Sequence, residues 1–579
     1  MASSETRCGR RFKDELHATP RSNLFNGRRG ACFLFCAPVR HKPRNHPFCE
    51  PSLTAVSHPD PETFDVAIVG LGPTGATLAA LLGRMGMRVH AMERNAQVYP
   101  QPRAVGFDHD AMRIFQSIGV TEALEPHIAP FNVGEYHGVD GQVIRRVLHI
   151  DPPYPLSWAP AYTCDQPGVE ACLRSVLTTM PNVRIGLGET LERFEQDGTG
   201  VRWTSRDANG RLRTGQAQFL VACDGASSSV RRALGIELDS LDYDESWVVV
   251  DVLVEPHALD QLPRTNVQYC EPARPCTFIT CPGVHRRWEF MTLPGEGGEG
   301  AVSQERLWAL LARWLRPGQA SIWRAASYRF HALIARRWRE GRVFLAGDSA
   351  HQTPPFLGQG MCQGLRDAGN LAWKLAAVLR GKAPMVLLES YERERSLHVA
   401  QTTHLAKDFG RIISERDPQR ARERDARMLA EGGGQAQIMV RQEWIPGLRE
   451  GWIDSASPGA GAVFPQPMVR RPGQAPCRLD DLTGPRWRLV CSVPPSADLA
   501  ARLERLGLPI VVINRSDSGT NMNPGVQVVH EESTLLQAWF TRQGTSFVLV
   551  RPDHHVCGTY SREDAVLTAV SAYVGGPVE

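Results

Sequence analysis

The chain has 579 residues, of which 42% are hydrophobic and 22% charged, and its formal net charge is only +3. That length suits two or three domains of a globular protein. So small a net charge, without a basic stripe interleaved with aromatic residues, argues against nucleic-acid binding. No stretch reaches the roughly 18–20 consecutive apolar residues of a membrane span, so we expect a soluble protein without a membrane partner.

The fourteen cysteines form no recognisable metal motif. Cys270, Cys276 and Cys281 lie near one another, but their spacing fits neither a zinc site nor an iron–sulfur site. Cysteine is a common small buried residue, and no secretory signal is present. We therefore expect no metal, free thiols and a location in the reducing cytoplasm.

Residues 1–61 differ in composition from the rest of the chain. The first sixty carry ten Lys or Arg against five Asp or Glu, with many prolines and no sustained apolar period. This composition predicts a disordered basic extension. A mitochondrial-type presequence is an alternative, but Asp14, Glu15 and the Pro- and His-rich stretch 38–47 disrupt an amphipathic helix. A start codon assigned too far upstream is a further alternative.

The segment FDVAIVGLGPTGATLAALLGRMGMRVHAMER, which starts at Phe64, combines a strand, a glycine turn, a helix and a second strand. Residues 65–69 predict a buried parallel strand. The helix is expected over residues 76–85, and the second strand over residues 88–92 leads into Glu93. Because all these parts fall in register, the segment predicts a dinucleotide site, although it does not distinguish FAD from NAD.

The three glycines of the turn have separate roles. Gly70 permits the tight turn, Gly72 lets the backbone approach a pyrophosphate, and Gly75 lets the helix pack closely on the strand. The helix N-terminus offers free N–H groups and a partial positive charge to the phosphates. Glu93 can accept hydrogen bonds from the ribose hydroxyls and would repel a 2′-phosphate, so NADP fits this turn poorly.

A second segment, GRVFLAGDSAHQTPPFLGQGMCQGLRDAGNLAWKL, places Gly347 and Asp348 at the end of a predicted strand over residues 343–346. A loop rich in Pro and Gly then leads into a helix over residues 365–379. A carboxylate at a strand end can hold a ribityl chain, and loop N–H groups can face the N1–C2=O edge of a reduced flavin. An ordinary strand–loop–helix crossover is the alternative.

A third segment, FLVACDGASSSVRRALG, places Asp224 after a strand over residues 219–223. On its own, this aspartate fits a cofactor site and the cap of a short helix equally well. Gln166, in CDQPGVEACLRSVL, stands at another predicted helix start and by itself indicates nothing further.

The order of these segments resembles that of the class A flavin-dependent aromatic hydroxylases, the para-hydroxybenzoate hydroxylase superfamily, over about residues 62–400. The chain is most similar to members that act on 3-(3-hydroxyphenyl)propionate or 3-hydroxycinnamate. That similarity runs through PRAVGFDHDAMRIFQSIG, EPARP, RRWEFM and GLRDAGNLAWKL as well as the segments above. The resemblance implies tightly bound FAD.

The resemblance also implies which residues hold the cofactor. Glu93 would bind the adenosine ribose, Gln166 the pyrophosphate and Arg103 the flavin side. Asp224 would serve FAD and NAD(P)H together, and Asp348 the ribityl or pyrophosphate portion. The complete expected set is Gly70, Gly72, Pro73, Thr74, Gly75, Glu93, Arg94, Arg103, Gln166, Asp224, Gly347, Asp348, Pro354, Gly358, Gln359, Gly360 and Met361.

Two positions depart from the family pattern. Cys362 stands where much of the superfamily has Asn, and Ala226 and Ser227 follow the Asp-Gly pair where an Arg is common. These departures leave the geometry toward the reductant open. We expect a structural role for His351, which directly follows the second motif, rather than that of a general base.

The resemblance implies an α/β fold: a Rossmann-type FAD-binding domain, split in sequence, with an inserted antiparallel-sheet substrate domain and a C-terminal thioredoxin-like domain. The FAD-binding monooxygenase part would span residues 62–450, with the substrate sheet inserted at about 240–330, where alternating strands are predicted. Helices are expected from residue 383 to about 442. The thioredoxin-like part, residues 460–575, has no Cys-x-x-Cys, so a dithiol redox role is unsupported.

The implied reaction, in aromatic catabolism, is hydroxylation of a phenolic ring ortho to its hydroxyl, with O₂ and a transient NAD(P)H, preferably NADH. The expected substrate is 3-(3-hydroxyphenyl)propionate or 3-hydroxycinnamate. Arg274 and Arg287 are candidates for its carboxylate, with a surface salt bridge as the alternative for each. No catalytic residue is identified. A hydroxylase of a polyketide or resorcinol-type ring and a non-oxygenating flavoprotein are the alternatives, since the motifs contact only the cofactor. A homodimer is left open.

Overall fold

The computed structural model describes residues 62–131, 133–296, 302–514 and 525–575. The predicted basic extension, residues 1–61, lies outside the described residues.

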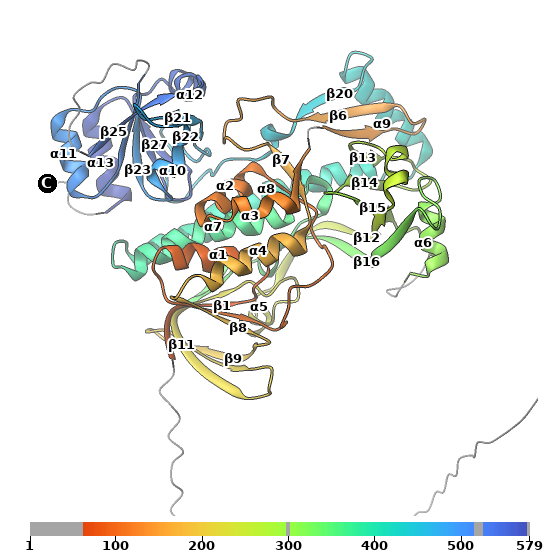
Figure 1. The fold of residues 1–579 in the computed structure, drawn as a ribbon, viewed down its shortest axis with the longest axis horizontal. Helices are drawn as coiled ribbons and strands as arrows, with labels where there is room; N and C mark the ends of the chain where they lie inside the picture. The colour runs from red at the N-terminus through yellow and green to blue at the C-terminus, as the bar shows by residue number, and fades with distance from the viewer. Residues whose placement is uncertain (1–61, 132, 297–301, 515–524, 576–579) are drawn as a thin grey trace, which may run out of the picture. The chain divides into compact units, whose positions relative to one another are not determined.

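An eight-stranded mixed sheet carries the glycine turn at the end of its first strand. Its strands are β1 (Glu62–Val69), β2 (Val89–Glu93), β8 (Val183–Leu187), β9 (Thr190–Gln196), β10 (Val201–Arg206), β11 (Leu212–Ala222), β17 (Arg339–Glu340) and β18 (Val343–Leu345). The order is β17-β18-β11-β1-β2-β8, with β10 and β9 continuing from β11 (Figure 1). From β18 to β8 all neighbours run parallel. Val66 pairs with Val89 and Phe219, and all three are buried, as strands covered on both faces require.

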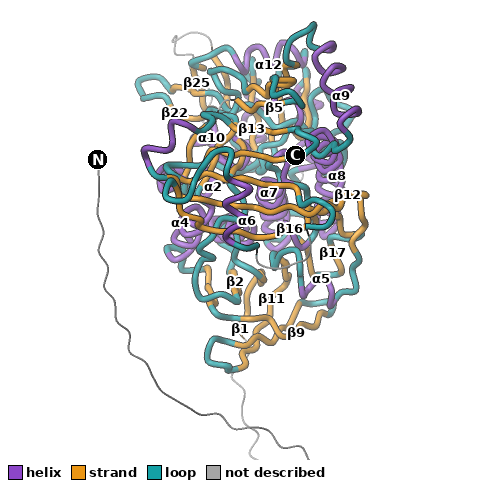
Figure 2. Tube along the Cα trace, turned by 90° about the vertical axis from the view of Figure 1, so that its right-hand side faces the viewer, coloured by secondary structure: helices purple, strands orange, loops and turns teal. Residues whose placement is uncertain are grey.

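Helices cover this sheet. The helix after the glycine turn, α1 (Pro73–Arg84), lies beside α4 (Gln166–Thr178) and α7 (Gly360–Leu379) (Figure 1). The other helices of this part are α2 (His109–Ile118), α3 (Thr121–Leu124), α5 (Ser229–Ala233) and α8 (Glu389–Ile413), whereas α9 (Pro418–Glu431) packs on strands of the second sheet. A small sheet is formed by β3 (Gly106–Asp108), β7 (Ala161–Cys164) and β4 (Ile128–Pro130). The turned view of Figure 2 shows β1, β2, β9 and β11 gathered together.

A second sheet has nine strands. In spatial order they are β19 (His351–Gln352), β16 (Ala320–Ala335), β12 (Leu238–Val254), β15 (His285–Met291), β14 (Cys276–Thr280), β13 (Asn266–Tyr269), β5 (Val133–His137), β6 (Val143–Leu148) and β20 (Gln437–Val440). All neighbours are antiparallel except β13 with β5 and β6 with β20. The sheet therefore includes strands from outside residues 240–330.

The two faces of the nine-stranded sheet differ, because successive side chains of a strand point to opposite faces. Val250, Phe278 and Trp288 pack with helix α6 (Gln304–Leu311) in one apolar cluster. Their neighbours along the strands, Val249 and Glu289 among them, line a cavity on the other face.

The C-terminal part contains a seven-stranded sheet between helices. Its strands, in spatial order, are β22 (Cys477–Arg478), β21 (Met468–Arg470), β25 (Val526–Glu531), β24 (Ile510–Asn514), β23 (Arg488–Cys491), β26 (Phe547–Val550) and β27 (Val556–Tyr560). Its helices are α10 (Leu479–Thr483), α11 (Ala497–Arg505), α12 (Leu535–Gln543) and α13 (Glu563–Tyr573). Side chains of α11 and α13 share one apolar cluster, and those of α12 lie in another.

The helical prediction for residues 383–442 is wrong at its end. Helices α8 and α9 occupy most of the range, but residues 437–440 form β20, which pairs with β6. That partner lies far away in the sequence, so the local pattern does not reveal the strand. Among the described residues, no helix is both long and apolar enough to cross a membrane.

Candidate active site

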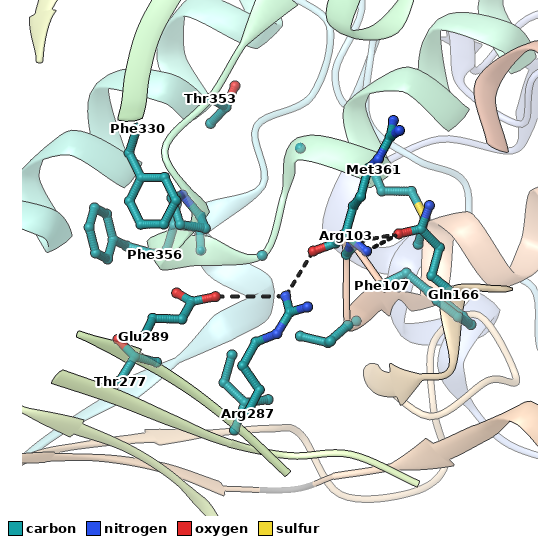
Figure 3. Close-up of a pocket in the computed structure, with 18 of the residues that line it drawn as sticks. Arg103, Phe107, Gln166, Thr277, Arg287, Glu289, Phe330, Thr353, Phe356 and Met361 are labelled. Carbon is teal, nitrogen blue, oxygen red and sulfur yellow. Dashed lines mark hydrogen bonds and ion pairs between the residues drawn. The ribbon is translucent and has the colours of Figure 1, made fainter. Parts of the chain in front are cut away.

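A cavity of about 530 Å³ is lined by residues of the nine-stranded sheet and by residues that directly follow strands β1, β11 and β18 of the eight-stranded sheet. This size is typical of small-molecule sites. Of the predicted cofactor residues, the cavity is lined by Gly72, Pro73, Thr74, Arg103, Gln166, Asp348, Gly358, Gly360 and Met361. Side chains of the nine-stranded sheet and of the loop after β19 complete it, including Tyr136 and Gln268. Thr277, Glu289, Phe330 and Phe356 also line it (Figure 3).

The glycine turn leaves room for a phosphate group. Gly70 has a φ of +97°, and a Cβ at Gly75 would lie 2.0 Å from the Gly70 oxygen, so glycine is required at both positions. Gly72 is the N-cap of α1 without a side-chain cap, and a Cβ there would meet no atom within 4 Å. Uncapped N–H groups therefore face open space, which is the environment that the pyrophosphate of FAD needs.

Glu93 lies at the end of β2 beside this turn. Its carboxylate accepts hydrogen bonds from the backbone N–H of Leu71 and from the backbone and side chain of Asn95, each at 2.9 Å. A carboxylate has about four acceptor positions, so one remains for a ribose hydroxyl. Arg94 is exposed next to it, and neither Glu93 nor Arg94 is among the described residues that line the cavity.

Gln166 positions the loop that carries Arg103 (Figure 3). Its Oε1 accepts hydrogen bonds from the backbone N–H of Arg103 at 2.8 Å and of Ala104 at 2.6 Å. The guanidinium of Arg103 lies 4.9 Å from the ring centre of Tyr99. Two predicted residues far apart in sequence thus meet at one side of the cavity.

Asp348 lines the cavity directly after β18. The side chain is exposed to the cavity, but the surrounding protein partly desolvates its carboxyl and raises its pKa, and the charges of His351 and Arg103 partly offset that rise. The neighbouring Gly347 donates its N–H to Asp367 at 2.9 Å, and His351 Nε2 lies 2.7 Å from the same carboxylate oxygen. His351 is therefore engaged in a buried pair, which supports a structural role.

Asp224 lies at the start of helix α5, whose N-cap is Ser228. The Asp224 carboxylate accepts hydrogen bonds from the backbone N–H of Ser229 at 2.8 Å and of Val230 at 3.3 Å, and Ser228 accepts one from the backbone N–H of Arg231 at 3.0 Å. Asp224 therefore supports the first turn of the helix alongside the Ser228 cap. The next residues, Gly225 and Ala226, line the cavity, whereas Asp224 is not among the described lining residues.

The predicted flavin loop lines the cavity at Gly358 and Gly360, whereas the side chain of Gln359 is not among the described lining residues. Gln359 donates to Asp108 at 3.0 Å and accepts from Arg366 at 2.9 Å, so its amide belongs to a buried polar network. Arg366 also donates to Asp108 at 2.7 Å, which ties α7 to the start of α2. Pro354 is buried at the start of the turn Pro355–Leu357 and is likewise not among the described lining residues.

Glu289 is a candidate that the sequence did not single out. It is 5% exposed on β15, opposite Thr277 on β14, and its carboxylate lies 3.8 Å from Nη1 of Arg287 (Figure 3). Burial raises the pKa of Glu289, although the charge of Arg287 opposes the rise. No described residue donates a hydrogen bond to it. The alternation in RRWEFM, with Trp288 in the core, would have indicated that Glu289 faces the other way.

The two predicted substrate arginines lie in different environments. Arg287 lines the cavity and donates to Asp251 at 2.7 and 2.9 Å and to the Arg103 oxygen at 2.8 Å, so it joins the Arg103 loop to the sheet. Arg274 forms a two-point pair with Glu296 and is not among the described residues on the cavity wall. Substrate contact by either arginine stays a prediction.

Two families match the chain. One, described as FAD binding domain, matches residues 63–406, and the other, described as HcaD C-terminal domain, matches residues 461–572. A probable NADH-specific resorcinol 4-hydroxylase of Rhodococcus jostii is 35% identical over 512 residues, 88% of this chain and 94% of the relative. A 3-(3-hydroxy-phenyl)propionate/3-hydroxycinnamic acid hydroxylase of Burkholderia cenocepacia is 35% identical over 511 residues, 85% of this chain and 93% of the relative.

Solved structures share the fold. The flavin-dependent monooxygenase PieE, crystallised with FAD and substrate, has a TM-score of 0.72 at 21% identity over 89% of this chain and 98% of that one. Aklavinone-11 hydroxylase, crystallised with FAD and aklavinone, has a TM-score of 0.71 at 24% identity over 88% of this chain and 99% of that one.

The mixed sheets, the glycine turn and the adjoining cavity define an FAD-dependent aromatic hydroxylase. The chain belongs to the FAD-binding family of class A flavin-dependent aromatic monooxygenases, which confirms the resemblance drawn from its motifs.

Proposed function

We propose that this chain hydroxylates a phenolic ring at the carbon next to its hydroxyl. One NADH, one proton and one O₂ are consumed, one oxygen atom enters the ring, and the other leaves as water with NAD⁺. The observation that carries the proposal is one continuous cavity that extends from the turn at Gly72 to Glu289 on the nine-stranded sheet. FAD, when bound, supplies hydride acceptance and oxygen activation. The protein then has to orient the ring, exclude water and move one proton.

Glu289 is our candidate for accepting the proton of the phenolic hydroxyl. Loss of that proton makes the adjacent ring carbon electron-rich, which the oxygen transfer requires. The described acidic residues on the cavity wall are Glu135, Glu289 and Asp348. Glu135 is already bonded to His137 at 3.1 Å and Arg146 at 3.0 Å, and Asp348 follows β18 of the other sheet, in the position expected to hold the cofactor. Glu289 lies on the nine-stranded sheet and has no described hydrogen-bond donor. A buried carboxylate with a raised pKa suits general-base work near neutral pH.

Aromatic side chains would hold the ring and keep water out. Phe330 and Phe356 meet edge to face, with ring centres 6.0 Å apart, on the cavity wall (Figure 3). Trp247 packs on both from behind, at 5.8 and 5.4 Å. Such a wall favours binding of an apolar ring and excludes water from the reaction.

We favour 3-(3-hydroxyphenyl)propionate or 3-hydroxycinnamate as substrate and NADH as reductant. The Burkholderia cenocepacia relative is named for those two acids. Resorcinol is the second candidate, because the Rhodococcus jostii relative, at the same 35% identity, is named as an NADH-specific resorcinol 4-hydroxylase.

Purified, FAD-loaded enzyme tests the proposal. NADH oxidation should be stimulated by at least one of these phenols, and mass spectrometry should find a product with one added oxygen ortho to a hydroxyl. NADPH should be the poorer reductant. Stimulated NADH oxidation that yields only peroxide, with no hydroxylated product from any of the phenols, would instead indicate a non-oxygenating flavoprotein.

The predicted domain boundaries and the roles of the predicted cofactor residues belong to the same proposal. A split Rossmann-type domain within residues 62–450 is supported by the parallel strands β18, β11, β1, β2 and β8. A thioredoxin-like fold for residues 460–575 is supported by the succession β23-α11-β24 and α12-β26-β27-α13 with the strand order β24-β23-β26-β27.

A cytoplasmic location agrees with the free thiols of all described cysteines. The possible homodimer stays a prediction.

A further inference from the structure

Arg441 is a cation on the cavity wall that has no acidic partner. It directly follows β20 and lines the cavity together with Trp444. Among the described residues, no carboxylate oxygen lies within 4.0 Å of its guanidinium. The side chain of Arg441 is only partly buried, so a ligand that fills the cavity would remove its charge from water. Because such a charge is costly unless it is paired, the site favours an anionic ligand.

The other arginines on the cavity wall either pair with a carboxylate or lie on the side of the glycine turn. Arg287 and Arg324 both pair with the buried Asp251, at 2.7 and 3.3 Å. Arg329 pairs with Asp244 at 2.7 Å. Arg103 lies on the side of the glycine turn, where its charge acts on Asp348. On the wall formed by the sheet and by β20, Arg441 is therefore the described cation that lacks a carboxylate.

The fold holds Arg441 in place without using up its donors. Val440 pairs with Leu148 in the parallel β20–β6 ladder, which brings Arg441 beside the residues that follow β6. Its Nη2 donates to the Leu357 oxygen at 2.6 Å and lies 3.6 Å from the position that a Cβ on Gly358 would occupy. Nε is buried without a hydrogen-bond partner, and Nη1 forms no hydrogen bond with a described residue. The guanidinium is thus oriented, while Nη1 and the second hydrogen of Nη2 have no described hydrogen-bond partner.

The neighbouring His149 carries no charge that would pair with Arg441 or attract the ligand in its place. Its Nδ1 lies 2.6 Å from the Phe131 oxygen. Burial, with a further contribution from the charge of Arg441, lowers the pKa of His149 to about 4. The imidazole is therefore neutral near pH 7, and Arg441 carries the positive charge of this part of the wall.

We propose that Arg441 binds the carboxylate of an anionic side chain on the phenolic substrate and so determines substrate specificity. The inference rests on the proposed hydroxylase function and sharpens it. An arginine can donate two parallel hydrogen bonds to a carboxylate, a geometry that a neutral phenol such as resorcinol cannot match. Arg441 thus selects a phenol with a short acidic chain, such as 3-(3-hydroxyphenyl)propionate.

Equilibrium binding to the FAD-loaded enzyme tests this directly. The probes are 3-(3-hydroxyphenyl)propionate and 3-propylphenol, which share a skeleton but differ in the carboxylate, and binding is followed by the change in flavin absorbance. Arg441→Gln should raise the Kd of the acid about 100-fold, because a charge-assisted pair is lost. The Kd of 3-propylphenol should change less than about twofold, and Arg441→Lys should restore part of the affinity for the acid.

Arg422→Gln is the matched control, because Arg422 is an exposed arginine on the nearby helix α9. It should leave both Kd values unchanged.

The proposal is overturned if Arg441→Gln weakens the binding of both ligands equally or of neither. It is also overturned if Arg441→Gln instead lowers FAD affinity or the rate of flavin reduction without substrate, since Arg441 would then contact the cofactor. Turnover of neutral phenols alone by the wild type, with no preference for the acid in binding, would reject Arg441 as an anchor while the hydroxylase function stands. Failure of every phenol to stimulate NADH oxidation would reject the function, and the binding comparison would still decide the role of Arg441.

Discussion

Oε2 of Glu394, on helix α8, lies 2.8 Å from Nη2 of Arg551 in the C-terminal part, 157 residues further along the chain. Lys374 on α7 donates to the same oxygen at 2.7 Å, and Asp553 pairs with Arg551 on its other side. All four side chains are almost completely buried. This cluster therefore joins the helices of the FAD-binding part to the sheet that follows residue 460.

Removing one charge from this cluster should destabilise the protein strongly. Glu394→Gln leaves Arg551 and Lys374 buried without their shared anion, and such losses cost about 3–5 kcal/mol. The free energy of unfolding in urea, measured on FAD-loaded protein, checks this. The exposed pair of Glu389 and Arg393, 3.5 Å apart on the same helix, provides the control. Glu389→Gln should cost less than about 1 kcal/mol, and equal effects of the two variants would contradict the prediction.

The same cluster should make stability depend on acid pH. Burial alone would raise the pKa of Glu394, but the charges of Arg551 and Lys374 outweigh it and lower the pKa to about 2. A lowered folded-state pKa adds stability that is complete above the unfolded value of 4.5 and is lost as the pH falls toward 2. Wild-type stability should therefore fall between about pH 5 and pH 2 more steeply than that of Glu394→Gln, as measured by urea unfolding along a pH series. Parallel curves for the two proteins would show that this group does not titrate as described.

Gly72 should be required for FAD binding rather than for folding. Its φ of −69° suits any residue, and a Cβ there would meet no protein atom but would enter the space for the pyrophosphate. We expect Gly72→Ala to weaken FAD binding about 100-fold in a fluorescence titration of the apoprotein while the urea midpoint stays unchanged. Gly198→Ala, at an exposed turn with equal free space, is the control and should alter neither quantity. A large loss of stability in Gly72→Ala would assign the glycine to the fold instead.

The sequence predicts the glycine turn well because its strand, turn and helix are local. Residues 65–69 lie within β1, the second strand is shifted by one residue, to 89–93, and the helix between them starts three residues before the predicted one, at Pro73. The directions of single side chains are harder to predict, because they depend on partners that only the folded chain supplies. Gln359 is one example: its amide lies against Asp108, 251 residues earlier.

The substrate side of the cavity shows the same limit. Arg441 reaches the flavin loop because β20 joins β6, a pairing between segments almost 300 residues apart that no local period indicates. Glu289 could have been found from strand alternation alone. Arg274, predicted on the basis of its charge, has a carboxylate partner in Glu296 that lies 22 residues away.

The two motif aspartates should respond differently to substitution. Asp224→Ala removes two hydrogen bonds at the start of α5 but leaves its N-cap, Ser228, and should lower the free energy of unfolding by about 1 kcal/mol, with little change in FAD affinity. Asp348→Ala removes a cavity carboxylate and should weaken FAD binding about tenfold with little change in stability. Urea unfolding and FAD titration of both variants separate the effects. If Asp224→Ala loses FAD as severely as Asp348→Ala, Asp224 also serves the cofactor.

Glu289 should produce an acid limb in the pH dependence of turnover. As a proton acceptor it works only when ionised, and burial raises its pKa above the ordinary value of 4.5. Activity should therefore be present above the raised pKa and disappear as the pH falls through it. Glu289→Gln should lower kcat about 100-fold at pH 7 and abolish this limb, while the FAD content stays unchanged. Glu255→Gln, at an exposed position after β12, should keep the wild-type profile. An unaltered acid limb in Glu289→Gln, measured with the best phenol, would mean that the phenolic proton leaves through another group.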